Sequence, residues 1–204
     1  MLVLVLTLST WCVLGFVQTL SDNIAAAAGG GVMVASQPQL TSWHSMILRN
    51  EGTHGGGVSS LGGPVQLFGG AVVGNAASLY GGGAYFQDSA VVNVTRVNVT
   101  TNTAGNGGGI DVRLSTTTAR TKFFIKDSVF RANVAQDNGG GVHVSGSHVQ
   151  THVAGSRFVA NAARAGGGVR VGTSGGTGSS SLLVQGTTFR GNALFDGSGT
   201  AGSL

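Results

Sequence analysis

Three side chains that could act together chemically occupy the same position in successive sequence repeats. Asp111, His143 and Arg170 each come directly after the apolar residue that follows a Gly-Gly-Gly triplet. A histidine oriented by a carboxylate is a common general base, and an arginine beside it could hold an anionic substrate. The alternative is a ladder of surface charges, in which each pair contributes well under about 1 kcal/mol to stability.

The position of these residues predicts where they point. Side chains alternate between the two faces of a strand, so a residue between two buried apolar residues faces outward. Across the repeats this row reads Met33, Ser59, Tyr85, Asp111, His143, Arg170. We expect the last three to face solvent as a surface ladder without catalytic competence, and we expect His143→Ala to leave the fold nearly unchanged.

Other reactive groups are sparse. Only 7 acidic residues occur, and no two lie within three positions of each other, whereas glycoside-cleaving sites need clustered carboxylates. On an extended strand His148 and His152 are separated by about 13 Å, too far to share a zinc ion. Cys12 is the single cysteine, so the chain has no disulfide and no cysteine-based metal site. We therefore expect no metal and no cofactor.

Two Asn-x-Thr sequons make Asn93 and Asn98 candidate acceptors for N-glycosylation in a secreted eukaryotic chain. The two asparagines have opposite parity along a strand. Both can point outward only if the strand breaks or bulges between them.

The elements that position these residues follow from an internal repeat. Six Gly-Gly-Gly triplets start 26, 26, 26, 32 and 27 residues apart, at Gly29, Gly55, Gly81, Gly107, Gly139 and Gly166. An asparagine precedes each triplet, and an apolar residue lies three positions before each asparagine. A period of this size is typical of a solenoid. The asparagines, which we expect to form a hydrogen-bonded ladder between coils, are Asn23, Asn50, Asn75, Asn102, Asn133, Asn161 and Asn192.

The composition favours strands over helices. Glycine accounts for 37 of 204 residues, and each glycine costs a helix about 1 kcal/mol relative to alanine. Runs such as residues 91–99 alternate apolar and polar side chains with period two. We predict an all-β fold, a right-handed parallel β-helix solenoid of about seven coils of 25–32 residues. Asn and Gly should take the left-handed corner conformations, and Phe130, Phe158 and Phe189 should stack inside the C-terminal coils.

The paired motifs resemble those of a known family. Phe130-Arg131-Ala132-Asn133 and two similar segments are similar to the FxxN motif of polymorphic outer-membrane proteins, and Gly139-Gly140-Gly141-Val142 is similar to their GGA[ILV] motif. The match covers residues 20–199. The resemblance implies a pectate-lyase-like β-helix in an extracellular passenger or adhesin-like stalk. Two features depart from the family pattern: no C-terminal export barrel is recognisable within residues 1–204, and Leu, Ile or Val replaces Phe in the first four repeats.

The two ends leave alternatives open. Residues 1–19 carry no charged side chain, and they could form a signal peptide, a membrane span or the strands of a first coil. Residues 20–204 hold the repeats. No amphipathic helix that could cap the solenoid is visible near the C-terminus, so we expect the chain to be a segment of a longer solenoid.

Charge and composition limit the partners. The net charge of +4 could favour acidic glycans or a membrane surface, or it could belong to an ordinary solvated exterior. No nucleic-acid-binding module is recognisable. We expect a non-enzymatic stalk or adhesin-like segment, extracellular or at the cell surface, with glycans or host and cell-surface proteins as partners. Any membrane association would run through the N-terminal apolar segment. The alternative is part of a carbohydrate-active β-helix enzyme.

Overall fold

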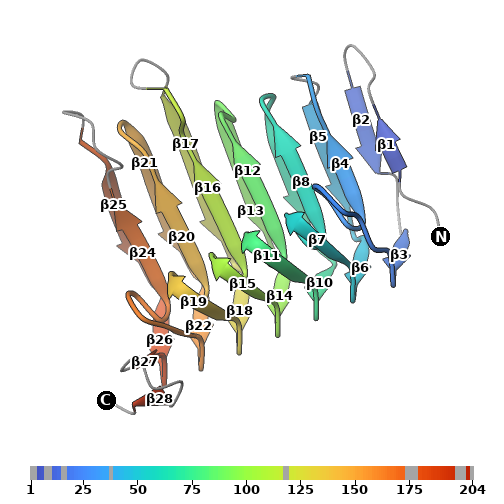
Figure 1. Ribbon diagram of the computed structural model, residues 1–204. Coiled ribbons are helices and arrows are strands. Elements are labelled where there is room, and N and C mark those ends of the chain that lie inside the picture. Colours follow the sequence, from blue (N-terminus) through green and yellow to red (C-terminus); the bar gives the residue numbers. More distant parts are fainter. Residues whose placement is uncertain are drawn as a thin grey trace.

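The chain winds into a parallel β-solenoid of four sheets in about six turns, which confirms the predicted fold class (Figure 1). The computed structural model describes residues 4–6, 11–14, 18–36, 39–116, 120–172, 179–195 and 201–202, with side chains between residues 18 and 195 of these ranges. No helix occurs in these ranges, so none of them contains a helix that could span a membrane.

From β4 to β27 each coil contributes one strand to each of the four sheets in turn, and the first coil adds β1, β2 and β3 to three of them. The strands of a sheet run parallel except at β28. Sheet A contains β1 (Leu4–Leu6), β4 (Val32–Val34), β8 (Val58–Leu61), β12 (Ala84–Gln87), β16 (Ile110–Arg113), β20 (Val142–Ser145) and β24 (Val169–Gly172). Sheet B contains β2 (Trp11–Leu14), β5 (Gln39–Trp43), β9 (Val65–Phe68), β13 (Val91–Thr95), β17 (Thr121–Lys126), β21 (Val149–Ala154) and β25 (Ser181–Gln185).

The other half of each coil forms two further sheets. Sheet C contains β3 (Thr19–Ser21), β6 (Met46–Leu48), β10 (Ala71–Val73), β14 (Asn98–Thr100), β18 (Val129–Arg131), β22 (Arg157–Val159) and β26 (Thr188–Arg190). Sheet D contains β7 (Glu51–His54), β11 (Ala76–Tyr80), β15 (Thr103–Asn106), β19 (Val134–Asn138), β23 (Ala162–Ala163), β27 (Ala193–Phe195) and β28 (Ala201–Gly202).

Two predicted regions are only partly described. β1 and β2, within residues 1–19, pair with β4 and β5 and so extend sheets A and B. Whether this segment also serves as a signal peptide stays a prediction. Positions 117–119, after β16, and positions 173–178, after β24, lie outside the described residues.

The interior is filled by rows of apolar side chains, one from each coil. Alternation along the strands sends Val, Ile, Leu and Phe inward, and most of them are fully buried. Phe130, Phe158 and Phe189 stack with ring centroids 4.7 and 4.9 Å apart, which confirms the predicted aromatic spine. Phe130 and Phe158 are fully buried, whereas Phe189, in the last described coil, is 45% exposed.

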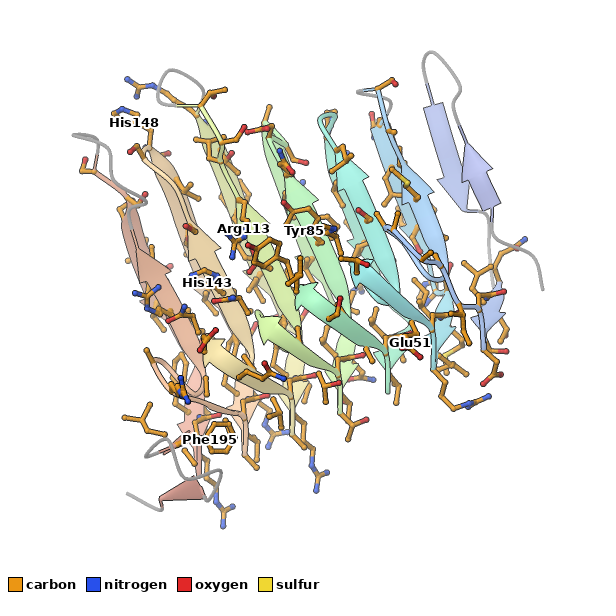
Figure 2. All side chains as sticks on the ribbon, in the orientation of Figure 1. Glu51, Tyr85, Arg113, His143, His148 and Phe195 are labelled. Atoms are coloured by element: carbon orange, nitrogen blue, oxygen red, sulfur yellow. The ribbon has the colours of Figure 1, made fainter. Side chains whose placement is uncertain are left out.

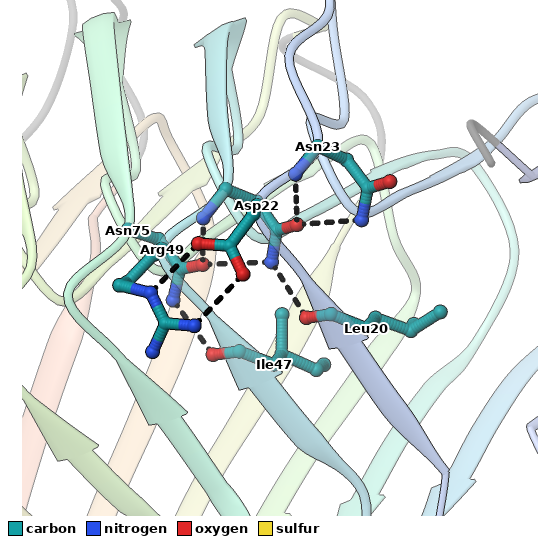
Figure 3. A network of polar contacts seen from close by, with 7 residues as sticks. Leu20, Asp22, Asn23, Ile47, Arg49 and Asn75 are labelled. Atoms are coloured by element: carbon teal, nitrogen blue, oxygen red, sulfur yellow. Dashed lines mark hydrogen bonds and ion pairs between the residues drawn. The ribbon is translucent and has the colours of Figure 1, made fainter. Parts of the chain in front are cut away.

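The asparagine side chains link successive coils, and Figure 3 shows the first of these links, from Asn23 to Asn75. The Nδ2 group of Asn50 donates to Oδ1 of Asn75 at 3.0 Å and to the carbonyl oxygen of Leu20 at 2.9 Å. The same Oδ1 of Asn75 also accepts the backbone N–H of Asn50. The pattern repeats from Asn23 to Asn192, so the buried amides find partners within the ladder.

The corner conformation differs from the one expected. The residue before each ladder asparagine has a positive φ, for example 49° at Arg49 and 53° at Thr101, and the asparagines themselves do not. The expectation that asparagine itself takes the left-handed conformation is therefore wrong. Its side chain must lie inside the corner to reach the neighbouring coils, so the preceding residue makes the turn.

The glycine triplets are required by the corner between sheets D and A. Gly81 has φ of 63°, which favours glycine. A Cβ atom on Gly82 or Gly83 would collide with carbonyl oxygens of the next coil, those of Gly108 and Gly109. The backbones of successive coils therefore meet without any side chain between them.

We predict that Phe158→Ala lowers the free energy of unfolding by about 3–5 kcal/mol, because it removes a fully buried ring from the middle of the spine. Chemical denaturation measures this loss. Phe189→Ala is the control and should cost clearly less, since its ring is packed on one side only. Equal losses for the two variants would show that the spine is not the source of the stability.

Candidate functional site

The corner where sheet D turns into sheet A collects a cluster of polar and aromatic side chains. They come from the last residue of the sheet D strands and from the outward positions of the sheet A strands. Figure 2 shows Tyr85, Arg113 and His143 on successive strands of sheet A. We call this set the corner cluster, and it consists of His54, Tyr80, Tyr85, Asp111, Arg113, His143 and Arg170.

Strand register brings the three sequence-predicted residues together. Asp111 pairs with His143, and His143 pairs with Arg170, on neighbouring strands. The expectation that all three face solvent is wrong, because Asp111 is 0% and His143 3% exposed, and only Arg170 is partly exposed. The glycine triplet causes this burial: it folds back over the following strand, so that a Cβ on Gly107 would collide with the Cβ of Asp111.

The contacts of Asp111 neutralise its buried carboxylate. Arg113 donates from Nε to Oδ1 at 3.0 Å, and His143 Nδ1 lies 2.9 Å from Oδ2. Nη1 of Arg170 lies 3.2 Å from His143 Nε2. Arginine can only donate, and the carboxylate only accepts, so both contacts are satisfied by a neutral imidazole with its proton on Nδ1. Arg113 then pairs with the carboxylate directly, and Arg170 contacts the opposite side of the imidazole.

The other half of the cluster is aromatic. The rings of His54, Tyr80 and Tyr85 lie 5.3–5.8 Å apart, and the guanidinium of Arg113 lies 3.5 Å above the ring of Tyr80. Partial burial, and then the nearby charge of Arg113, lower the pKa of His54 below its usual value. Burial, and then the charge of Asp111, raise the pKa of Tyr85. Both shifts favour the neutral forms of these rings.

This geometry favours a packed network over a catalytic centre. A histidine that acts as a general base needs a free ring nitrogen within reach of the substrate. Both nitrogens of His143 are engaged, by Asp111 and by Arg170. The groups of the cluster hold one another, and Asp111, His143 and Arg170 tie three successive strands of sheet A together.

Sequence reasoning identified only part of this cluster. Tyr85 stood in the predicted outward row, but His54, Tyr80 and Arg113 were missed. His54 and Tyr80 both directly precede a glycine triplet, and Arg113 lies two positions beyond Asp111. The period of the repeat places these residues at the same corner. What the sequence did not indicate is that the glycine turn folds back over the following strand there.

The two sequon asparagines both point outward. Arg96, with φ of 55°, turns the chain between β13 and β14, so the alternation restarts. Val94 and Val99 then face the core, while Asn93 is half-buried on sheet B and Asn98 is exposed on sheet C. Their glycosylation stays a prediction.

The remaining charged and metal-ligating residues lie apart. Asp22 accepts two hydrogen bonds from Arg49, and this pair lowers the pKa of the exposed carboxyl (Figure 3). His152 is hydrogen-bonded to Gln185, and His148 lies at the turn before β21. Within the described residues no three metal-ligating side chains come together.

Comparison of this chain with protein families, with curated proteins and with solved structures finds no match. Its function has to be argued from its own geometry.

We predict that the protein loses stability as the pH falls below about 6.5, the ordinary pKa of histidine. The folded state holds the pKa of His54 below the unfolded value, so the unfolded chain binds the proton first and stability declines with falling pH. His54→Gln should make thermal unfolding midpoints less dependent on pH in this range. His44→Gln, which changes an exposed histidine, is the control. An unchanged pH dependence in the His54 variant would show that His54 is not the source of the stability loss at low pH.

We also predict that Asp111→Asn destabilises the fold by about 1–3 kcal/mol, since the substitution removes the buried carboxylate that accepts from Arg113 and from His143. His143→Ala should also destabilise, in contrast to the expectation from sequence. Asp137→Asn removes an exposed pair with Arg164 and should change stability by less than about 1 kcal/mol. Denaturation curves that place both aspartate variants at the same midpoint would refute the structural role of Asp111.

Proposed function

We propose that this chain is a non-enzymatic segment of an extracellular or cell-surface protein, a β-solenoid that serves as a stalk and presents an adhesin-like surface. The observation that carries this proposal is the difference between the inward and corner positions of the coils and their outward positions. The inward and corner positions repeat from coil to coil, as in the asparagine ladder and the glycine triplets. The outward positions vary much more, as in the row Gln66, Asn93, Phe124, His152 and Leu183 on sheet B, so the repeat builds a rod and leaves its surface free to vary.

The sequence motifs support the same proposal. The FxxN-like segments and glycine triplets are similar to the repeats of polymorphic outer-membrane proteins and of pectate-lyase-like β-helices. In this interpretation the partners are glycans or host and cell-surface proteins, and nucleic acid is not among them. Membrane association, if it occurs, runs through residues 1–19.

A carbohydrate-active enzyme is the second candidate. The buried pair of Asp111 and His143 favours it, because such a pair can orient a general base. However, Arg170 contacts Nε2 of His143 and would have to move away before this nitrogen could accept a proton from a substrate. No second carboxylate accompanies Asp111 among the described members of the corner cluster, whereas glycoside hydrolysis ordinarily uses two.

One experiment separates the two candidates. The protein is presented to immobilised glycans and to intact cells, and in parallel it is incubated with a panel of polysaccharides whose cleavage is followed by reducing ends. We expect binding without cleavage. Cleavage that disappears in a folded His143→Gln variant, and persists in His44→Gln, would replace the stalk with the enzyme. Absence of any binding to glycans, proteins or cells would also overturn the proposal.

A further inference from the structure

The outward face of sheet B carries a row of lysine, phenylalanine and lysine on one strand. Along β17 the side chains alternate between buried and exposed, so that Lys122, Phe124 and Lys126 all point away from the core. Phe124 is 36% exposed. An apolar ring with a cation on each side therefore lies open on this face.

Two hollows lie on either side of Phe124. The ring of His152, on the neighbouring strand β21, stands edge-on to Phe124 at a centroid distance of 6.2 Å, and the two rings form a low ridge. One hollow, of about 360 Å³, lies between this ridge and the row of Thr95 and Lys126. The other, of about 240 Å³, lies between the ridge and Gln150. The walls of both hollows are mostly apolar.

The arrangement of the hollows matches the period of an extended chain. Along the strand direction one hollow lies between the levels of Phe124 and Lys126, and the other lies between the levels of His152 and Gln150, displaced by about one strand toward β25. Outward residues on a strand are spaced by about 6.6 Å. A peptide laid along these strands in extended conformation presents alternate side chains with the same spacing, so two of its side chains can enter the two hollows.

The charge of this face selects an acidic partner. Beyond the second hollow a third one, of about 460 Å³, is lined by Arg120, Lys122 and His148. Neither lysine of the row has an ion-pair partner in the described part of the chain. The outward positions of the four strands β13, β17, β21 and β25 include no acidic residue, and Asp127 lies at the corner that follows β17. Cations therefore flank the apolar ridge at both ends.

We propose that the outward face of sheet B binds an extended acidic segment of a partner protein. Two apolar side chains of this segment, two residues apart, enter the hollows beside Phe124, and acidic residues on both sides pair with Lys126 and with Lys122 and Arg120. The inference rests on the proposed surface-binding function and names its partner class. The mostly apolar hollows favour apolar side chains over a glycan, whose hydroxyl groups would need hydrogen-bond partners there.

The test uses a labelled synthetic peptide with one phenylalanine and one leucine at alternate positions, flanked on each side by glutamates. Binding is followed by fluorescence anisotropy at low and high salt. One control peptide has the same composition with its apolar residues adjacent, so that an extended chain directs them to opposite faces. A second has lysine in place of each glutamate. The protein is made in bacteria, so that Asn93, which lines the first hollow, carries no glycan.

Matched variants identify the surface. Phe124→Thr should weaken binding of the alternating peptide about tenfold, and Lys122→Glu with Lys126→Glu should abolish its salt-sensitive part. Leu79→Thr removes an exposed apolar residue from sheet D, and Arg131→Glu with Arg157→Glu makes the same charge change on sheet C. These controls should bind like the wild-type protein. Circular dichroism and thermal unfolding establish that each variant is folded.

Several results would overturn the inference. Equal binding of the alternating and adjacent peptides, or of the lysine peptide, would refute the spacing or the charge argument. Unchanged binding in the folded sheet B variants would place the site elsewhere. If a sulfated oligosaccharide binds through Phe124 and the lysines while no peptide does, the partner is a glycan, and the proposed surface-binding function stands. If peptides, oligosaccharides and cells all fail to bind, both proposals fail.

Discussion

Backbone pairing between successive coils is the constraint on which the rest of this structure depends. Every coil must place its carbonyl and amide groups one strand spacing from those of the next coil. This holds also at the corners, where the chain is not part of a regular β-sheet. At the corner between sheets D and A only glycine fits, because the carbonyl oxygens of the next coil occupy the space of a side chain. At the corner between sheets C and D the asparagine amides complete the pairing. Stacking without cross-links therefore suffices to hold the rod.

The same constraint explains the corner cluster. Because the glycine corner is tight, the chain folds back on itself, and the first outward residue of sheet A is covered by the preceding turn. A charged side chain in that position loses its water and must find partners within the protein. Asp111 finds them in Arg113 and His143, which come from its own strand and from the next one. A corner built for backbone pairing thus creates a buried polar network.

Outward residues away from this corner remain in contact with water and do not need partners within the protein. On sheet B the strands are longer, and Lys122, Phe124 and Lys126 are exposed, with no described turn folded over them as the glycine triplet is folded over Asp111. The last described coil shows the opposite limit. Leu182, Val184 and Phe189 point along the core rows yet are 40–45% exposed, since they are packed on one side only. Exposure in this protein is decided by what lies above a residue as much as by which way it points.

The sequence by itself determined the period, the parallel β-solenoid, the rows that fill the core and the spine of Phe130, Phe158 and Phe189. These follow from local rules, namely alternation along strands and the recurrence of glycine and asparagine. Only the tertiary structure decided that Asp111 and His143 are buried and that Arg113 and Tyr80 join them. Alternation tells on which side of a strand a residue lies, but the curvature of the coil decides whether that side is open. Curvature depends on how neighbouring turns pack, and no single repeat contains that information.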